Sequence, residues 1–170
     1  MSREIKFRAW LKEEKKMVNV ETIDFTDKSM QHLEKNEIID AYLLRRVVFE
    51  DVELMQYTGD KDVYGNEIYE DDFIIDVSED GDYFLKLIGF GNDEKEYSSI
   101  LNGFKIIRGI ELDLYFDDKE GIFKGSHSYL LEKYKIKIEK GSNEKWIHFQ
   151  VIGNKHENPE LLNFLEGKNG

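Results

Sequence analysis

Alternating apolar and polar positions dominate the chain and predict β-strands along most of it. Near the start, Ile5 and Phe7 alternate with basic side chains, which is the period of two expected of a half-buried strand. A polar turn at residues 12–16 and a second apolar run at residues 17–20 complete the pattern. The sequence therefore opens with a predicted β-hairpin.

One segment departs from this alternation. Residues 28–46 place Ile38, Ile39, Tyr42 and Leu43 on one face at helical spacing. We therefore predict a helix here, which ends near the last residue of the segment.

Strand patterns return from residue 52 onward. A short C-terminal helix is predicted over residues 160–165, directly after Pro159, a residue that suits the start of a helix. The predicted strands cover residues 52–57, which lead into a turn at Thr58 and Gly59, and then residues 73–77, 83–90, 112–116, 122–123, 134–138 and 147–151.

Together these elements predict an α+β fold that is mainly β. The hairpin at residues 134–151 has one apolar and one polar face, as the wall of a barrel or sandwich requires. The predicted domains are an N-terminal strand hairpin and helix lobe over residues 1–50, a β-barrel domain over residues 51–157, and a C-terminal helix and frayed tail over residues 158–170.

Composition excludes several classes of protein. The 170 residues are 40% hydrophobic, which is too rich for a disordered acidic chain. The absence of cysteine excludes disulfides and thiolate chemistry and fits a reducing cytosol. No apolar run is long enough to span a bilayer, so we expect no membrane partner.

The net charge of −12 is unevenly distributed. Residues 60–82 hold ten acidic side chains and one basic side chain. Because nucleic-acid binding depends on Lys and Arg, this charge makes a nucleic-acid partner unlikely. Clustered carboxylates repel one another, so the segment is a solvated loop, a metal site or a docking face for a basic partner.

Part of this acidic segment has the spacing of a calcium loop. Asp60, Asp62, Gly65 and Asp71 match acidic and glycine positions of an EF-hand, but Tyr64 replaces a ligand and the flanks read as strands. A looser divalent site could use Glu70, Asp71 and Asp72. We favour a solvated turn, where Asp and Gly are common for backbone reasons, and we expect no metal and no cofactor.

The sequence contains no arrangement typical of catalysis. The four histidines lack zinc-site spacing and a base-orienting partner: they are His32, His127, His148 and His156. The run Gly89, Phe90 and Gly91 is too short for a phosphate loop. We therefore predict no catalytic residue and no enzymatic activity.

Three residues are candidates for a protein interface. Trp146 lies on the polar side of its predicted strand, and Tyr64 accompanies the acidic segment, as does Asp71. Exposed aromatic side chains beside charge are a common interface composition.

Three sequence blocks together resemble the YopX family of phage and prophage proteins. They cover residues 3–10, 55–72 and 151–162, whereas residues 84–145 match poorly. The motif residues are Trp10, Tyr57, Thr58, Gly59, Asp62, Gly65, Glu67, Ile68, Tyr69, Glu70, Asp72, Gly153, Asn154, Glu157, Asn158 and Pro159.

The chain departs from the family pattern at two positions. Asp60 stands where the family tends to have an apolar residue, and Asp71 stands where it usually has Gly. If that Gly has a positive φ, Asp is among the less costly replacements.

The resemblance implies a phage origin, an SH3-like barrel, homo-oligomerisation and a location in the cytoplasm of the bacterial host. It supplies no catalytic residues. We expect a non-enzymatic oligomeric accessory protein that binds an unknown phage or host protein. The alternatives are an acidic decoy that inhibits a host nucleic-acid-binding protein and a nucleic-acid-associated small barrel.

Overall fold

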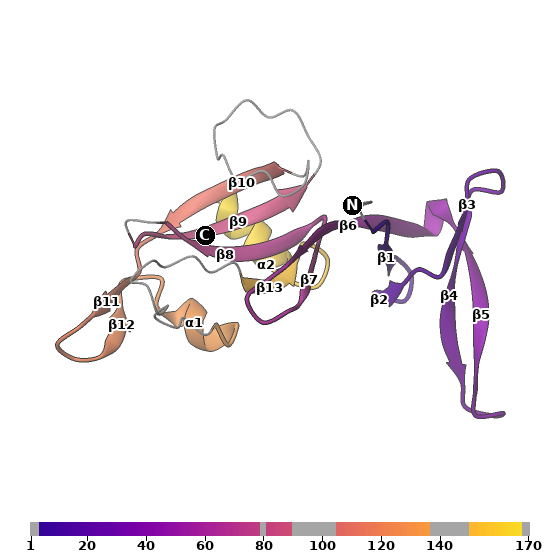
Figure 1. Ribbon diagram of the computed structural model, residues 1–170, viewed down its shortest axis with the longest axis horizontal. Helices are drawn as coiled ribbons and strands as arrows, with labels where there is room; N and C mark the ends of the chain where they lie inside the picture. Colours follow the sequence, from indigo (N-terminus) through magenta and orange to yellow (C-terminus); the bar gives the residue numbers. More distant parts are fainter. Residues whose placement is uncertain (1–3, 79–80, 90–104, 137–149, 168–170) are drawn as a thin grey trace. The chain divides into compact units, whose positions relative to one another are not determined.

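The computed structural model describes residues 4–78, 81–89, 105–136 and 150–167 (Figure 1). The described part is mainly β, with two short α-helices. The chain divides into two compact units, Met1–Tyr57 (unit 1) and Thr58–Gly170 (unit 2). The sequence-based division placed its first boundary at residues 50/51 and separated residues 158–170, which here belong to unit 2. Within the described ranges, no helix is long and apolar enough to cross a membrane.

The first sheet of unit 1 contains the predicted N-terminal hairpin. Strand β1 (Phe7–Leu11) pairs antiparallel with β2 (Lys16–Asn19) and with the start of β6 (Val52–Lys61). Ala9 and Leu11 point into a core that also contains Met30 and Val52. The predicted hairpin is confirmed.

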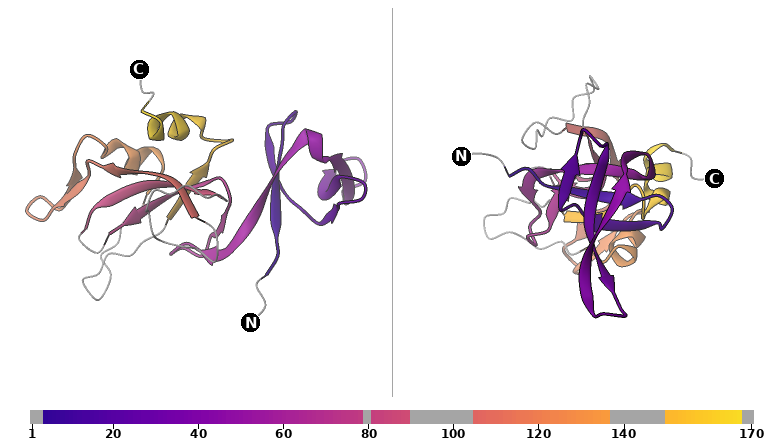
Figure 2. Two further views of the ribbon diagram at one scale, coloured as in Figure 1. Left: turned by 90° about the horizontal axis from the view of Figure 1, so that it is seen from above. Right: turned by 90° about the vertical axis from the view of Figure 1, so that its right-hand side faces the viewer.

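The prediction of a helix at residues 28–46 is wrong, because this segment forms part of the second sheet of unit 1. Strands β3 (Thr22–Asp24), β4 (Ser29–Asn36) and β5 (Ala41–Val48) form an antiparallel sheet, in which β4 and β5 are the long twisted pair seen in Figure 2. The helical spacing marks no buried face, because the side chains on it are exposed: Ile38, Ile39, Tyr42 and Leu43.

The physical pattern in this segment is that of a strand. Met30 and His32 alternate along β4 toward the core and are almost fully buried. Asp40 closes the β4–β5 turn with a φ of 46°. A 3-10 turn, η1 (Phe49–Asp51), then leads into β6.

Strand β6 also corrects a predicted turn at Thr58 and Gly59. The strand continues through Gly59, which has a φ of 93°, and its last residues pair in unit 2 with β7 (Glu67–Tyr69). The Thr58 hydroxyl donates a buried hydrogen bond of 2.8 Å to the carbonyl of Ile68. A glycine next to a strand pattern predicts a chain reversal, but Gly59 instead lies within an irregular strand.

Unit 2 is built on a four-stranded antiparallel sheet. Its strands, in order, are β10 (Lys105–Leu112), β9 (Tyr83–Gly89), β8 (Asp72–Val77) and β13 (Gln150–Asn154). The predicted strands at residues 73–77 and 83–90 correspond to β8 and β9, whose last described residue is Gly89.

Both faces of this sheet carry apolar side chains. Phe73 and Leu85 contribute to a large cluster with Leu130 and Leu161, which come from the two helices. The alternate residues of these strands, such as Ile74, point to the other face of the sheet and belong to a second, smaller cluster. The central strand β8 is buried along its whole length.

The predicted strand at residues 112–116 is interrupted. β10 ends at Leu112, and a separate hairpin follows, made of β11 (Tyr115–Asp117) and β12 (Ile122–Lys124). The break lies at Asp113, whose carboxylate accepts a 2.8 Å hydrogen bond from the amide of Ser126. The predicted strand at residues 122–123 is confirmed as part of β12, and residues 118–121 form the turn before it.

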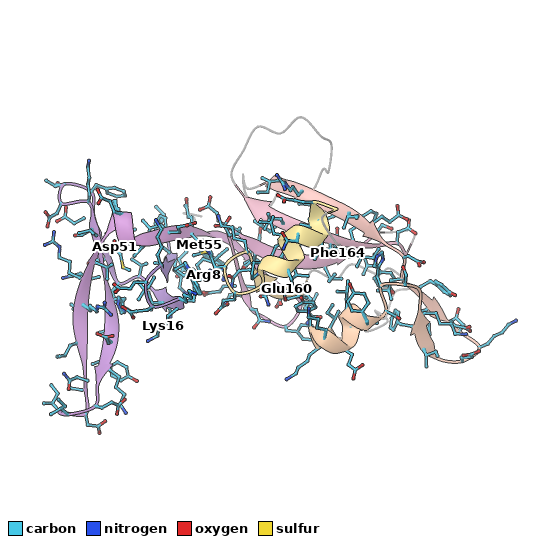
Figure 3. The ribbon with its side chains drawn as sticks, turned by 180° about the vertical axis from the view of Figure 1, so that it is seen from behind. Arg8, Lys16, Asp51, Met55, Glu160 and Phe164 are labelled. Carbon is cyan, nitrogen blue, oxygen red and sulfur yellow. The ribbon has the colours of Figure 1, made fainter. Side chains whose placement is uncertain are left out.

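The two helices differ in how well the sequence predicts them. Helix α1 (Tyr129–Lys133) was not predicted, and the predicted strand at 134–138 is wrong at Tyr134 and Lys135, which form the turn after α1. Helix α2 (Pro159–Leu165) is confirmed and begins at its proline. Glu160 and Phe164 project from α2 in Figure 3. Residues 137–149, including Trp146, lie outside the described residues.

Candidate functional site

The middle and C-terminal motif blocks meet in unit 2. Strand β8 pairs antiparallel with β13, so that Asp72 lies opposite Asn154 and Phe73 lies opposite Gly153. Two blocks that are about 80 residues apart in the sequence therefore form one region, which we call the motif junction and define as residues 62–72 together with 151–158. The polar side chains of this region are the first candidates for a functional site.

Asp62 organises the turn between β6 and β7. Its carboxylate accepts hydrogen bonds from the amides of Tyr64 (2.9 Å) and Asn66 (2.8 Å) and from the Asn66 side chain (2.9 Å). It also accepts a 3.1 Å hydrogen bond from the amide of Val151, the residue before the bulge in β13. Asp62 is only 6% exposed, so this carboxylate ties the turn to the last strand of the sheet.

Two adjacent acids hold the β7–β8 turn. Asp72 is fully buried, and its carboxylate accepts a 2.8 Å hydrogen bond from the amide of Tyr69. Asp71 has a φ of 65°, so the position where the family usually has Gly does adopt a positive φ in this chain. The backbone of Asp71 bonds on both sides, donating to the carbonyl of Ile88 and accepting from the amide of Lys155.

The Asp71 side chain contacts two basic groups. Its carboxylate lies 2.8 Å from the Lys155 ammonium and 3.6 Å from Nε2 of His156. Burial alone would raise the pKa of Asp71, but the nearby basic groups of His156 and Lys155 outweigh it and lower that pKa below its usual value. Asp71 is therefore a charged, partnered group at neutral pH.

The C-terminal side of the motif junction is a network of asparagines. The side-chain oxygen of Asn154 accepts hydrogen bonds from the backbone amides of His156 (3.1 Å) and Glu157 (3.0 Å). The side-chain amide of Asn154 donates a 2.6 Å hydrogen bond to the carboxylate of Glu157. Asn158 accepts a 3.2 Å hydrogen bond from the amide of Asn154. This network turns the chain from β13 into α2, where Pro159 starts the helix.

These contacts change the interpretation of the acidic segment. The prediction of a solvated turn is wrong at Asp62 and Asp72, which are buried and bonded within the fold. The span that resembles an EF-hand contains the end of β6 and all of β7 rather than one loop. The spacing of Asp60, Gly65 and Asp71 therefore reflects strand ends, and Asp62 uses its carboxylate oxygens to bind chain amides.

The acidic segment is also less exposed than its composition suggests. Asp76 on β8 and Lys86 on β9 form an ion pair, and both side chains are close to fully buried. Glu67 accepts a 2.7 Å hydrogen bond from the hydroxyl of Tyr69. Among the acids of this segment that the structure describes, Asp82 alone is largely exposed to solvent. Much of the charge of residues 60–82 thus lies within the folded unit.

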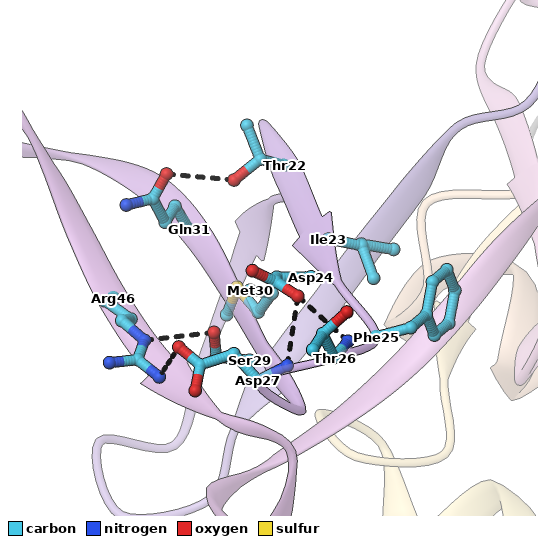
Figure 4. A pocket seen from close by; sticks show the side chains of 10 residues that line it. All are labelled: Thr22, Ile23, Asp24, Phe25, Thr26, Asp27, Ser29, Met30, Gln31 and Arg46. Carbon is cyan, nitrogen blue, oxygen red and sulfur yellow. Dashed lines mark hydrogen bonds and ion pairs between the residues drawn. The ribbon is translucent and has the colours of Figure 1, made fainter.

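A separate pocket of about 530 Å³ lies in unit 1 beside the β3–β4 turn (Figure 4). Met30 is among its lining residues, and Arg46 pairs with Asp27 and donates a 3.0 Å hydrogen bond to Ser29. The Asp24 carboxylate accepts from two amides of its own turn. The polar groups of this pocket are therefore used to hold the turn.

The remaining predicted interface and motif residues are dispersed. Tyr64 is exposed at the tip of the β6–β7 turn, beside Gly65 with its φ of 83°. Trp10 lies half-buried in β1, opposite Met17 on β2. The interface prediction for Trp146 falls outside the described residues.

The sequence reasoning missed the β4–β5 hairpin as a candidate surface. It carries exposed large apolar side chains on both strands and in the turn, namely Leu33, Ile38, Ile39, Tyr42, Leu43, Leu44 and Val48. The alternation of Met30 and His32 in the sequence is the signal that could have revealed this surface. It indicates a strand, and in a strand hairpin the apolar residues that follow have no buried face to occupy.

Comparison with known proteins agrees with the motif blocks. The family model described as YopX protein matches residues 6–163, so the chain belongs to the YopX family. Comparison with curated proteins gave no match. Among solved structures, the chain is similar to protein EF1440 from Enterococcus faecalis at 23% identity and a TM-score of 0.42, over 95% of this chain and 99% of that chain.

Proposed function

We propose that this protein is a non-enzymatic, phage-type accessory protein that works as an oligomeric binding module in the cytoplasm of a bacterial host. The observation that carries the proposal is the β4–β5 hairpin, with seven large apolar side chains exposed in unit 1. Exposed apolar side chains gathered on one element are costly in water and are typical of interaction sites. The hairpin therefore provides the binding surface.

The motif junction supports a non-enzymatic role. Its polar side chains hold turns and strand ends: Asp62 and Asn154 accept from chain amides, and Asp71 pairs with Lys155. A catalytic group must reach a substrate atom, whereas these groups are occupied by the fold. The motif junction is accordingly a structural element that stabilises unit 2.

The two alternative functions find less support. A decoy needs a continuous exposed face of carboxylates, but Asp62, Asp72 and Asp76 are buried. A nucleic-acid module needs a basic face, and Arg45 and Arg46 are paired with acids of unit 1.

We also infer that the sheet of unit 2 is part of an SH3-like barrel. The antiparallel order β10-β9-β8-β13 and the large apolar cluster on one of its faces support this inference. An experimental structure of the full chain tests it, and an open sheet with two free edges would contradict it.

The test of the proposed function combines light scattering with affinity capture. We expect the full chain to be larger than a monomer at micromolar concentration, or to capture a partner from infected host cells. The variant Tyr42→Ser/Leu44→Ser should lose this association without unfolding, because both side chains are exposed. Tyr115→Ser is the matched control, since Tyr115 is exposed on the β11–β12 hairpin of unit 2. If the hairpin variant and the control behave like the original chain, the proposal is wrong.

A further inference from the structure

Strand β5 is an edge strand that lacks most of the usual protection against strand addition. In the sheet order β3-β4-β5 it has one neighbour among the described strands. Its eight residues pair with β4 in unbroken register, from Ser29 opposite Val48 to Asn36 opposite Ala41, with no bulge. Edge strands are normally blunted by charged side chains, proline, bulges or short length. Strand β5 contains neither lysine nor proline, and its two charged residues, Arg45 and Arg46, are paired with acids of unit 1.

The side chains of β5 make this edge apolar. Leu44 lies opposite Leu33, and Tyr42 is two residues further along the same face of the hairpin. These three side chains are 56%, 48% and 66% exposed, respectively. On the other face, Leu43 is also exposed. A strand that is added to β5 would therefore cover apolar side chains on both faces.

We propose that the occupant is β5 of a second copy of this chain, paired antiparallel about a two-fold axis at Leu44. This inference rests on the proposed function, because it names the partner of the same hairpin. It predicts one continuous sheet in the order β3-β4-β5-β5-β4-β3. The interface is isologous, so both copies contribute the same strand.

The centre at Leu44 follows from symmetry and charge. When two copies of a strand pair antiparallel about a two-fold axis perpendicular to the sheet, paired residues lie on the same face of the sheet. Even-numbered residues then pair with even-numbered residues and odd with odd, and the residue on the axis faces its own counterpart in the second copy. A centre at Arg45 would place two guanidinium groups opposite each other, which is unfavourable. A centre at Leu43 would use only residues 41–45 of the strand, whereas a centre at Leu44 pairs residues 41–47.

The Leu44 register also matches the side chains of the two copies. Leu44 meets Leu44 of the second copy, next to Leu33 of each copy on the same face. Tyr42 faces Arg46 of the second copy, whose half-exposed guanidinium can stack on the ring. A single paired edge buries less than a standard interface of roughly 1,600 Å², so the association is a reversible one.

Cysteine cross-linking tests the register directly, because the chain has no cysteine of its own. In this register the two copies of position 44 lie roughly 5 Å apart between Cα atoms, which a disulfide can bridge. The two copies of position 48 lie roughly 27 Å apart along the strands. Leu44→Cys should therefore form a disulfide dimer under mild oxidation at least about tenfold faster than Val48→Cys. Equal rates at the two positions would overturn the proposal.

Two lysine variants separate edge pairing from stacking of the hairpin faces. Leu44→Lys places a charge on the edge strand and should abolish the dimer seen by light scattering. Leu33→Lys places the same charge on the same face but one strand inward, and should leave the dimer. Loss of the dimer in both variants would indicate face-to-face packing and overturn the edge pairing.

The outcomes also separate this inference from the proposed function. If Leu44→Cys does not cross-link but Tyr42→Ser/Leu44→Ser still abolishes capture of another protein, the hairpin binds a different partner and only the self-pairing is overturned. If neither association nor capture depends on the hairpin, both proposals fail.

Discussion

Asp71 shows how a single residue combines backbone strain with a charge pair. Its φ of 65° costs free energy for any residue other than Gly, although Asp tolerates this region better than most. The hydrogen-bonded backbone of the turn and the Lys155 ion pair oppose this cost. The departure from the family glycine is therefore compensated within this chain.

Asp71→Asn should lower the free energy of unfolding at pH 7 by about 1 kcal/mol, because the amide keeps the backbone preference but loses the charge. The folded-state pKa of Asp71 is lowered, so its stabilising contribution is present above the unfolded-state pKa and is lost as the pH falls through the folded-state value. Urea unfolding from pH 7 down to about pH 3.5 should show the two proteins converging below about pH 4. A difference that stays constant with pH would contradict this account.

Gly153 is required for space as well as for conformation. Its φ is 153°, and a Cβ atom would lie 2.0 Å from Oδ1 of Asn158. Gly153→Ala should therefore destabilise the protein by at least about 2 kcal/mol. Gly65→Ala is the matched control, since Gly65 has a φ of 83° but no atom within 4 Å of its Cβ position, and it should cost about 1 kcal/mol. Thermal unfolding of both variants measures the difference, and equal losses would argue against a steric role for Asn158.

At the scale of the element, the β4–β5 hairpin shows where local pattern reading succeeds and where it fails. The N-terminal hairpin was predictable because apolar residues alternate in both strands and a polar turn separates them. Residues 28–46 failed because exposed apolar residues in a turn, such as Ile38 and Ile39, imitate a helical stripe. Helical spacing of apolar residues predicts a helix only when those residues pack against the rest of the protein. The sequence alone does not reveal which apolar residues remain exposed.

The structure predicts opposite results for two apolar residues of this segment. Ile38 is 94% exposed in the turn, so Ile38→Asp should change the free energy of unfolding by less than about 0.5 kcal/mol. Met30 is fully buried in the core of unit 1, so Met30→Ala should cost about 3 kcal/mol. Urea denaturation of the two variants tests this contrast, and a large loss for Ile38→Asp would favour the helix.

The motif junction was only partly predictable for a related reason. The sequence identified its residues, and the resemblance grouped Asp62, Asp72 and Asn154 as motif positions. It did not indicate that the first two are buried or that Asp62 bonds to the amide of Val151. Such a contact depends on the β8–β13 register, which no local spacing encodes.

At the scale of the whole molecule, the net charge of −12 limits association between copies. Like-charged molecules repel, and salt screens that repulsion with a Debye length of about 10 Å at 0.1 M. Pairing through an apolar edge should therefore strengthen as salt is added, whereas binding of a basic partner to residues 60–82 should weaken.

Sedimentation at about 50 and 500 mM salt distinguishes these two modes. We expect the self-association constant to rise over this range, and the Asp82→Asn variant, which removes an exposed charge of the acidic segment, to raise it slightly at the lower salt concentration. Self-association that weakens with salt would indicate that charge pairs hold the copies together.

The pairing of β8 with β13 has a consequence for how the protein is synthesised. Asp62 leaves the ribosome long before Val151, its hydrogen-bond donor 89 positions later. Unit 2 therefore cannot complete its sheet until almost the whole chain has been made, and contacts of such long range slow folding. A chain that is cut before residue 150 would leave the Asp62 carboxylate without the Val151 amide and β8 without its neighbour β13, and would be a substrate for proteases rather than a smaller working protein.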